Sequence, residues 1–273
     1  MPTFVDRDRM VSLLSEEFAA VSALCGGFDE AAWATPTCLP GWTVKDQLSH
    51  IAGTERMLSG EPAPDVSLSD APYLRNDVGR ANELWVEANR PLTGAAVLAS
   101  FESVVARRLA VLDAMTQADF DAPSWTPVGR DETYGRFMRV RHYDCFLHEH
   151  DIRLALGMED RDEPAHIASA LAETAPALGY IVGRKAAIPP GASVRIEVTG
   201  AVPATYLVRV GERAELVERL EAGPTAGIRL PVMLFLRLTG GRLLARDQPE
   251  GEIVLEGDTE LASQLAGNLA YTI

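Results

Sequence analysis

The spacing of apolar residues changes near Gly157, and this change limits the fold more than any other feature of the sequence. Before that point apolar side chains recur every three or four residues, which places them on one face of a helix. In residues 9–27 such a stripe ends at Gly26 and Gly27, a common helix stop. Further helical segments are predicted at 40–58, 74–90, 92–115 and 136–156. Residues 1–158 are therefore predicted to form an all-helical bundle, with a polar loop at 124–135.

The second part of the chain has a mixed pattern. The polar run at 158–164 has the composition of a linker, and 166–185 is predicted to be a helix. Residues 192–200 and 205–210 alternate apolar and polar side chains, as half-buried strands do, and 251–269 predicts a strand, a turn and a final helix. The predicted fold class is α+β, with a helical domain at 1–158 and a smaller α+β domain at 159–273.

The composition excludes several classes of protein. The net charge of −14 argues against a nucleic-acid partner, because phosphate binding needs a basic surface. No segment approaches the roughly 18 uninterrupted apolar residues of a membrane span, and the N-terminus lacks the apolar core of a secretory signal. A cytoplasmic protein is expected. Cys25, Cys38 and Cys145 are widely spaced and form no CxxC pair, so they are predicted to be reduced thiols.

Three of the five histidines fall within "RHYDCFLHEH", residues 141–150, together with an aspartate and a glutamate. Residues four apart lie on one face of a helix, so Asp144 and His148 can both reach one divalent ion. A catalytic zinc-type site needs about three protein ligands and one open position. His50, in another predicted helix, is the best third candidate, because His166 lies beyond the linker.

Each of these residues also has a simpler interpretation. An aspartate and a histidine four residues apart arise often by chance, and His50 also fits a core histidine bonded to a neighbour. His142 and His150 are most simply solvated surface residues. Asp46 is a competing ligand, but Thr43 and Asp46 form a predicted capping box. In that motif the Asp46 carboxylate already accepts a hydrogen bond from a free amide at the start of the helix. On spacing alone, both interpretations stay open.

Two helical motifs and the end of the chain resemble one known family. "LPGWTVKDQLSHIAG", residues 39–53, and "RHYDCFLHEHDIRLALG", residues 141–157, resemble signatures of the mycothiol-dependent maleylpyruvate isomerase family, within the DinB-like superfamily. The stretch "LTGGRLLARDQPEGEIVLEGDTELASQL", residues 238–265, is similar to the family's C-terminal domain, which is related to sterol-carrier-type (SCP2-like) folds. The resemblance covers nearly the whole chain. It implies a DinB-like up-down four-helix bundle followed by a smaller SCP2-like domain.

The resemblance also implies a metal site. In the family a histidine from the second helix and a carboxylate plus a histidine from the last bundle helix bind a divalent metal, usually Zn²⁺. Carried over by motif, these residues are His50, Asp144 and His148, the set that helical spacing also selects. The family's carboxylate is often glutamate, so the shorter Asp144 is a departure that bears on metal affinity and identity.

The activity that the resemblance implies is that of a metal-dependent isomerase or S-transferase. A metal with an open position lowers the pKa of a bound thiol, here mycothiol, which then attacks a small electrophile. Addition to an electron-poor double bond, rotation and elimination give cis–trans isomerisation. The basic residues are almost all arginine, with lysine only at Lys45 and Lys185, which suggests a GC-rich, actinobacterial genome consistent with mycothiol.

An anionic substrate would need cationic contacts. Arg75 and Arg80 lie on a predicted helix with Asn76, and Asn76 and Arg80 are expected to contact the thiol cosubstrate. Arg80 and Arg242 are the candidate catalytic residues, since Arg242 matches an arginine of the family's C-terminal "GR" motif. A solvated surface salt bridge is the alternative for each arginine. Packing roles are predicted for Trp42, Trp85 and Cys145.

Two rival functions use the same scaffold. One is a non-catalytic small-molecule-binding or regulatory protein, which has no need of a complete set of three ligands. The other is a structural bundle with a closed metal shell, for which Asp46 or Glu149 would supply the fourth ligand. The complete set of three ligands favours the enzyme.

Overall fold

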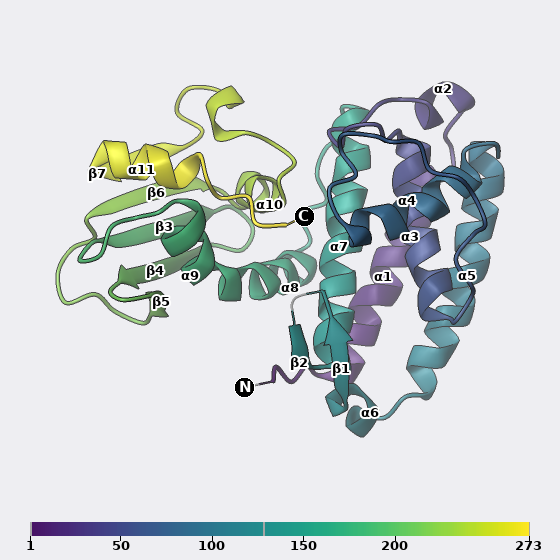
Figure 1. The fold of residues 1–273 in the computed structure, drawn as a ribbon, viewed down its shortest axis with the longest axis horizontal. Helices are drawn as coiled ribbons and strands as arrows, with labels where there is room; N and C mark the ends of the chain where they lie inside the picture. Colours follow the sequence, from purple (N-terminus) through teal and green to yellow (C-terminus); the bar gives the residue numbers. More distant parts are fainter. Residues whose placement is uncertain (1, 128, 273) are drawn as a thin grey trace. The chain divides into compact units, whose positions relative to one another are not determined.

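The protein contains two compact units, Met1–Asp160 and Arg161–Ile273 (Figure 1). The structure is a computed structural model and describes residues 2–127 and 129–272. The first unit is mainly helical, and the second contains a five-stranded sheet in its described residues. The predicted α+β fold class is confirmed. The sequence pattern places the division between residues 158 and 159.

The bundle of the first unit is built from long helices that begin at side-chain caps. These helices are α1 (Arg7–Cys25), α3 (Val44–Leu58), α5 (Gly94–Ala114) and α7 (Tyr134–Ala155). Asp6, Thr93 and Thr133 each accept a hydrogen bond from a first-turn amide of α1, α5 and α7. At α3 the predicted capping box is confirmed: Asp46 accepts from the Thr43 amide at 2.8 Å, and Thr43 accepts from the Asp46 amide.

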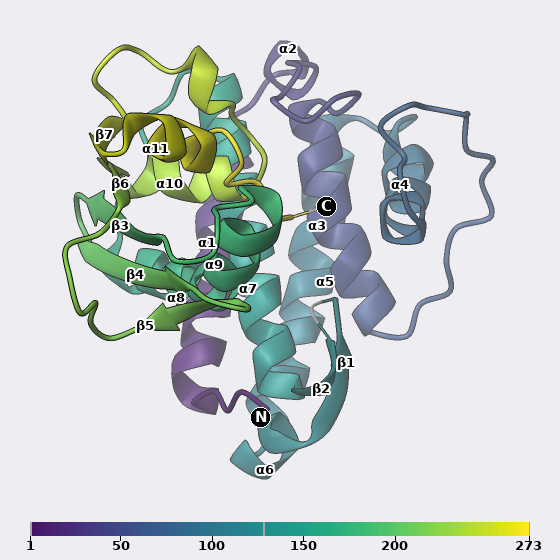
Figure 2. The same cartoon turned by 60° about the vertical axis from the view of Figure 1, so that its left-hand side comes forward.

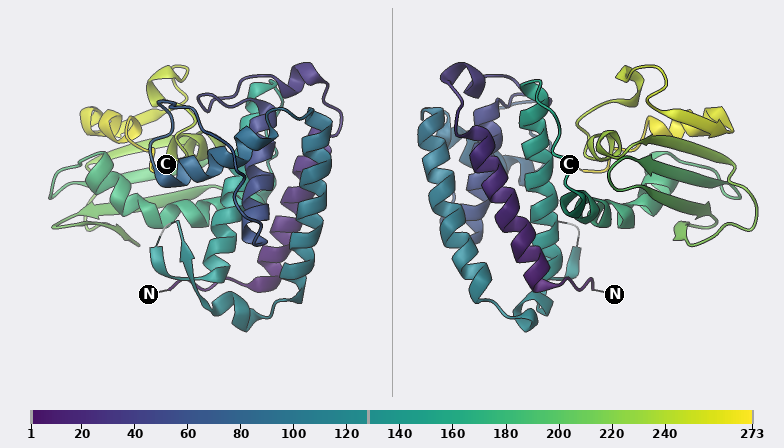
Figure 3. Two further views of the ribbon diagram at one scale, coloured as in Figure 1. Left: turned by 45° about the vertical axis from the view of Figure 1, so that its right-hand side comes forward. Right: turned by 180° about the vertical axis from the view of Figure 1, so that it is seen from behind.

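These helices run up, down, down and up in chain order (Figure 3). The start of α3 lies beside the start of α5, because Lys45 Nζ donates to the carbonyl of Arg90 at 2.9 Å. The start of α1 lies beside the end of α5, where Arg7 donates to the Leu112 carbonyl at 2.8 Å. α3 and α5 therefore run in the same direction. The reason is α4 (Asp77–Asn89), which packs against α3 and returns the chain to the end where α3 begins.

The contact between α3 and α4 depends on a glycine. A Cβ atom at Gly53 would lie 2.3 Å from the Trp85 Cβ, so only glycine lets the two helices approach this closely. Trp85 is largely buried in this contact, which confirms its predicted packing role. The packing of Trp85 against Gly53 thus keeps α4 beside α3, and α4 leads the chain to the end of the bundle where α5 begins.

The interior of the bundle is apolar and contains two of the cysteines. Phe18 and Phe101 meet edge to face with ring centroids 6.1 Å apart, as aromatic pairs in cores prefer. Burial raises the pKa of the Cys25 thiol to about 12 and that of Cys145 well above 9.0. Both thiols therefore stay protonated near neutral pH. Cys145 is fully buried, which confirms its predicted place in the core.

Shorter elements complete the first unit. They are α2 (Glu30–Trp33), α6 (Gln117–Asp121), β1 (Pro123–Thr126) and β2 (Gly129–Thr133). The two strands pair antiparallel, so the prediction of a loop at 124–135 is wrong. The Trp125 ring contacts Phe137 of α7 edge to face, and this tertiary contact is absent from the local pattern.

In its described residues, the second unit contains a five-stranded β-sheet together with several helical segments (Figure 2). Its strands are β3 (Ser193–Thr199), β4 (Ala204–Val210), β5 (Ala214–Val217), β6 (Ala226–Pro231) and β7 (Val254–Gly257), in the order β5-β4-β3-β6-β7. β3 pairs parallel with β6, and the other pairs are antiparallel. Its helical segments are α8 (Pro164–Thr174), η1 (Ala175–Ala177), α9 (Leu178–Tyr180), η2 (Ile181–Lys185), α10 (Val232–Thr239), η3 (Ala245–Asp247) and α11 (Thr259–Ala266). β3 alternates buried and half-buried side chains, as its sequence predicts.

The mostly apolar segment at 226–239 divides into β6 and α10. α10 is apolar but has 8 residues, far fewer than the roughly 20 that a membrane-spanning helix needs. Within residues 2–127 and 129–272, no helix is long and apolar enough to cross a membrane.

Candidate metal centre

Three side chains from α3 and α7 converge inside the bundle. His50 Nε2 lies 3.1 Å from Asp144 Oδ2, and His148 Nε2 lies 3.5 Å from Asp144 Oδ1. One ligand atom from each of the three residues lies within 4.8 Å of the other two. Asp144 and His148 are one turn apart on α7, and His50 faces them from α3. The structure thus brings together the set that sequence spacing selects.

The pKa values of two of these groups suit metal binding. Burial lowers the pKa of His50 from 6.5 to about 4, so its imidazole is neutral near pH 7. Burial alone would raise the pKa of Asp144, but the charges of His50, His148 and Arg141 lower it well below 3.8. Metals bind neutral imidazole and ionised carboxylate, so both groups are already in the form that coordinates an ion.

The donor set fits a divalent ion of the zinc type. Two imidazoles and one carboxylate form a recognised catalytic zinc set, in which a fourth position is left for water or substrate. The two carboxylates considered as a fourth protein ligand have other partners. Asp46 belongs to the capping box of α3, and Glu149 accepts from Arg153 at 2.8 and 2.7 Å. This arrangement favours an open metal site over a closed structural one.

A buried ion-pair network supports Asp144. Arg141 donates to Asp144 Oδ2 and also to Glu55 Oε1 of α3, at 3.0 Å from Nε and 2.9 Å from Nη2. Arg108 of α5 donates to the other oxygen of Glu55 at 3.2 Å. Positive and negative charges alternate among these side chains, so the buried carboxylate of Glu55 and the half-buried carboxylate of Asp144 are both paired. The network fixes the orientation of Asp144 toward the two imidazoles.

Sequence reasoning missed Arg141 as a part of this site. A signal was present, because Arg141 lies three residues before Asp144, a spacing that puts the two side chains on one helix face. Glu55 offers no comparable local signal. Its partners come from α5 and α7, 53 and 86 residues further along the chain.

Trp42 lies beside both imidazoles, although the sequence predicts only a packing residue. Its ring centroid is 5.3 Å from that of His50 and 6.0 Å from that of His148. The indole Nε1 donates to Glu83 of α4 at 2.8 Å, so its polar atom is already paired. Trp42 is half-buried and precedes the first turn of α3, outside the periodic pattern that reveals helix faces.

Glu83 holds the segment that carries Trp42. Besides the indole, its carboxylate accepts from the Tyr73 hydroxyl at 3.0 Å and from Arg90 at 2.9 Å. Tyr73 packs against Gly41, where a Cβ atom would lie 2.4 Å from its ring. Gly41 also has a φ of +79°, a conformation that favours glycine. The "PGW" part of the first motif therefore places the indole.

The residues predicted to contact the substrate or the thiol do not belong to the group of three side chains that forms the candidate centre. Asn76 caps α4 and accepts from the Gly79 amide at 2.8 Å. Arg75 and Arg80 are exposed, and neither side chain has a hydrogen bond or ion pair to another residue within 2–127 and 129–272. Arg242, in the second unit, donates to the Gly240 carbonyl at 2.6 Å. The contacts predicted for Asn76, Arg80 and Arg242 stay predictions.

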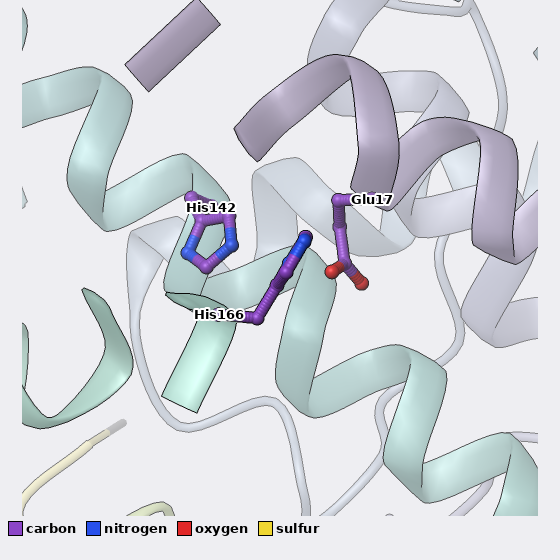
Figure 4. A group of neighbouring side chains, drawn as sticks. All are labelled: Glu17, His142 and His166. Atoms are coloured by element: carbon purple, nitrogen blue, oxygen red, sulfur yellow. The ribbon is translucent and has the colours of Figure 1, made fainter. Parts of the chain in front are cut away.

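The remaining histidines of the cluster are buried rather than solvated. His150 Nδ1 is 2.7 Å from the Phe146 carbonyl, and the His142 ring stacks with that of Phe146. Figure 4 shows His142 on α7 and Glu17 on α1; His166, also drawn there, belongs to α8 of the second unit. The prediction of solvated side chains is wrong, because α7 buries residues on several faces.

The helical bundle presents two imidazoles and a carboxylate on facing helices, and the same chain continues into an α+β unit. Together these features define a class of candidate metalloprotein. The family model described as the mycothiol maleylpyruvate isomerase N-terminal domain matches residues 14–153, about half of the chain. The chain belongs to this family. The resemblance seen in its motifs is confirmed, and at the level of the family so is the prediction of an isomerase-type enzyme.

Solved structures show the same fold over nearly the whole chain. A crystal structure of the mycothiol-dependent maleylpyruvate isomerase has a TM-score of 0.61 and 15% sequence identity, covering 94% of this chain and 96% of that one. A histidine-to-alanine mutant of that enzyme has a TM-score of 0.59 at 14% identity, with the same coverage. A search of curated proteins gives no match.

Proposed function

We propose that the protein is a metal- and mycothiol-dependent isomerase or S-transferase. His50, Asp144 and His148 would hold a divalent ion, Zn²⁺ by the type of ligand, with a position left for the thiol. The observation that carries this proposal is the convergence of the three side chains within 4.8 Å inside a paired, buried network. Family membership supports mycothiol as the thiol and a maleylpyruvate-isomerase-like reaction on a small electrophile.

In the proposed reaction the thiol is regenerated and is not consumed. His50, Asp144 and His148 would hold the divalent ion, which when bound would lower the pKa of the thiol, so that thiolate would be present near neutral pH. The sulfur forms a bond to one carbon of an electron-poor cis double bond, and the electron pair of that bond moves onto the conjugated carbonyl. After rotation about the new single bond, the thiolate leaves and the double bond re-forms as trans.

The protein's own side chains have distinct tasks in this proposal. Arg141 keeps Asp144 ionised and oriented, and Trp42 places an apolar ring beside the imidazoles. An apolar wall lowers the local dielectric constant and so strengthens the field around the centre. Arg75 and Arg80 have no side-chain partner in the described part of the chain, which leaves them available to a substrate carboxylate.

The proposal is tested by metal analysis of the purified protein and two matched histidine variants. The wild type is expected to hold about one zinc or similar ion per chain, and His148→Ala is expected to lose it. His150→Ala, the same change on the same helix, should retain the ion, because the His150 ring bonds to a backbone carbonyl. Mycothiol-dependent turnover of cis electrophiles by the wild type is then expected to disappear in His148→Ala.

The outcomes separate the rival functions. An unloaded wild type that takes up no ion after addition of zinc would overturn the metal centre. A loaded protein without any thiol-dependent turnover would favour a binding or regulatory protein on the same scaffold. The cytoplasmic location and the likeness of the second unit to sterol-carrier domains stay predictions.

A further inference from the structure

The imidazole of His148 has a second partner on the side away from Asp144. Its Nδ1 forms a short hydrogen bond with Oε1 of Gln47, which lies one turn before His50 on α3. The Gln47 side chain is fully buried, and His148 is 4% exposed. Neither end of this hydrogen bond can exchange its partner for bulk water at low cost.

Thr37 determines which way the Gln47 amide points. The Thr37 hydroxyl donates its single proton to the Trp42 carbonyl at 3.0 Å, since a carbonyl can only accept. The hydroxyl oxygen must therefore accept from Gln47, whose Nε2 lies 2.8 Å away. With its nitrogen facing Thr37, the amide presents its oxygen to His148, and His148 Nδ1 must carry the proton.

A nearby charge acts in the same direction. Asp151, one turn after His148 on α7 and 1% exposed, has Oδ2 3.5 Å from His148 Nδ1. Its other oxygen accepts from the Cys38 thiol at 3.3 Å. Negative charge beside Nδ1 favours a proton there, as carboxylates behind metal-binding histidines commonly do.

We propose that Gln47, oriented by Thr37, is a positioning residue that holds His148 in the tautomer with its proton on Nδ1. The lone pair of Nε2 then faces Asp144 and His50, where a metal would bind. The role of this tautomer in metal binding rests on the proposed function. The tautomer itself is a property of the metal-free chain. A neutral amide also adds no charge to the centre, unlike a carboxylate in the same place.

The first test reads the tautomer directly. Long-range proton–nitrogen NMR correlations distinguish protonated from bare ring nitrogens, and the His148 signals are assigned by their loss in His148→Ala. Metal-free wild type is expected to show the proton on Nδ1. Gln47→Leu removes the acceptor at similar volume and is expected to shift the population to Nε2–H, whereas Gln47→Glu keeps an acceptor and should retain Nδ1–H.

The second test measures zinc affinity by competition with a chromophoric chelator. Loss of a hydrogen bond behind a metal ligand typically weakens metal binding about 10- to 100-fold, and this fall is expected in Gln47→Leu. Gln264→Leu is the control, because that amide bonds to the Ala186 carbonyl in the second unit. Its affinity and its His148 tautomer should match the wild type.

Each outcome decides one question. A wild type with the proton on Nε2, or a Gln47→Leu variant with unchanged tautomer and affinity, overturns the role of Gln47. If Gln47→Leu does not fold, Thr37→Val becomes decisive, since it leaves Gln47 in place and removes only the group that orients it. An unchanged tautomer in Thr37→Val would overturn the proposal. A wild type with Nδ1–H that binds no zinc would overturn the metal centre and leave the tautomer assignment intact.

Discussion

Replacement of His50 by glutamine is expected to change how the stability of the metal-free protein depends on pH. Burial lowers the pKa of His50 to about 4 in the folded chain, against 6.5 for an exposed imidazole. Above pH 6.5 the ring is neutral in both states, and the shift costs nothing. Between pH 6.5 and pH 4 the unfolded chain gains a proton that the folded chain does not, so stability falls as the pH falls.

The magnitude follows from the size of this shift. At about 1.4 kcal/mol for each pH unit, the interval from 6.5 to about 4 corresponds to a loss of about 3 kcal/mol. In the folded chain Asp144 does not titrate in this interval, because its pKa lies well below 3.8. Glutamine has no proton to gain, and its amide can still donate to Asp144.

Urea denaturation of chelator-treated wild type and His50→Gln at several pH values between 7 and 4 measures the effect. The free energy of unfolding of the wild type should fall by about 3 kcal/mol more than that of the variant over this range. Contributions from groups common to both proteins cancel in the difference. Parallel pH profiles would refute the argument, because they would mean that His50 takes up its proton as readily in the folded chain as in the unfolded one.

Two further predictions concern side chains around the centre. Binding of Co²⁺ to the metal-free protein is expected to quench the fluorescence of Trp42, since its ring lies 5.3 and 6.0 Å from the two imidazoles. Most of this quenching should disappear in Trp42→Phe and persist in Trp125→Phe, and equal quenching in both variants would contradict the assignment. Arg141→Met removes the arginine partner of Glu55 Oε1 and of Asp144 from the ion-pair network, and it is expected to lower the free energy of unfolding by about 3–5 kcal/mol in urea denaturation. The control Arg107→Met removes an exposed ion pair and should cost less than about 1 kcal/mol, so equal losses would refute the role of burial.

The three side chains of the candidate metal centre were predictable because local rules constrain them. Asp144 and His148 lie on one helix at a spacing that fixes their relative position, whatever the rest of the chain does. His50 was found through its place in a helix whose start is marked by the capping box of Thr43 and Asp46. The pairing of α3 with α7 came from the family resemblance, since spacing alone left both interpretations open.

Features that depend on tertiary contacts were less predictable. The direction of α5 follows from the return of the chain along α4, which rests on the packing of Trp85 against Gly53. Gln47 lies on the same helix as His50, but nothing in its neighbourhood reveals a partner 101 residues away.

Local pattern was also insufficient in two apolar or irregular segments. The mostly apolar segment at 226–239 fits a buried strand as well as a buried helix, and it forms one of each. The β1–β2 hairpin is short, and the Trp125–Phe137 contact with α7 supports it. Periodicity identifies the faces of long elements, but packing decides where short ones form.

The placement of the ligands on α3 and α7 has a consequence for biosynthesis. His50 and Asp144 are separated by 94 residues, and α7 is the last of the long bundle helices to leave the ribosome. A nascent chain that ends before α7 carries one of the three ligands, and its Glu55 has only the partner from α5. The three ligand atoms of the candidate centre can therefore come together only after α7 has docked against α3, so an ion held by all three side chains would require the assembled bundle.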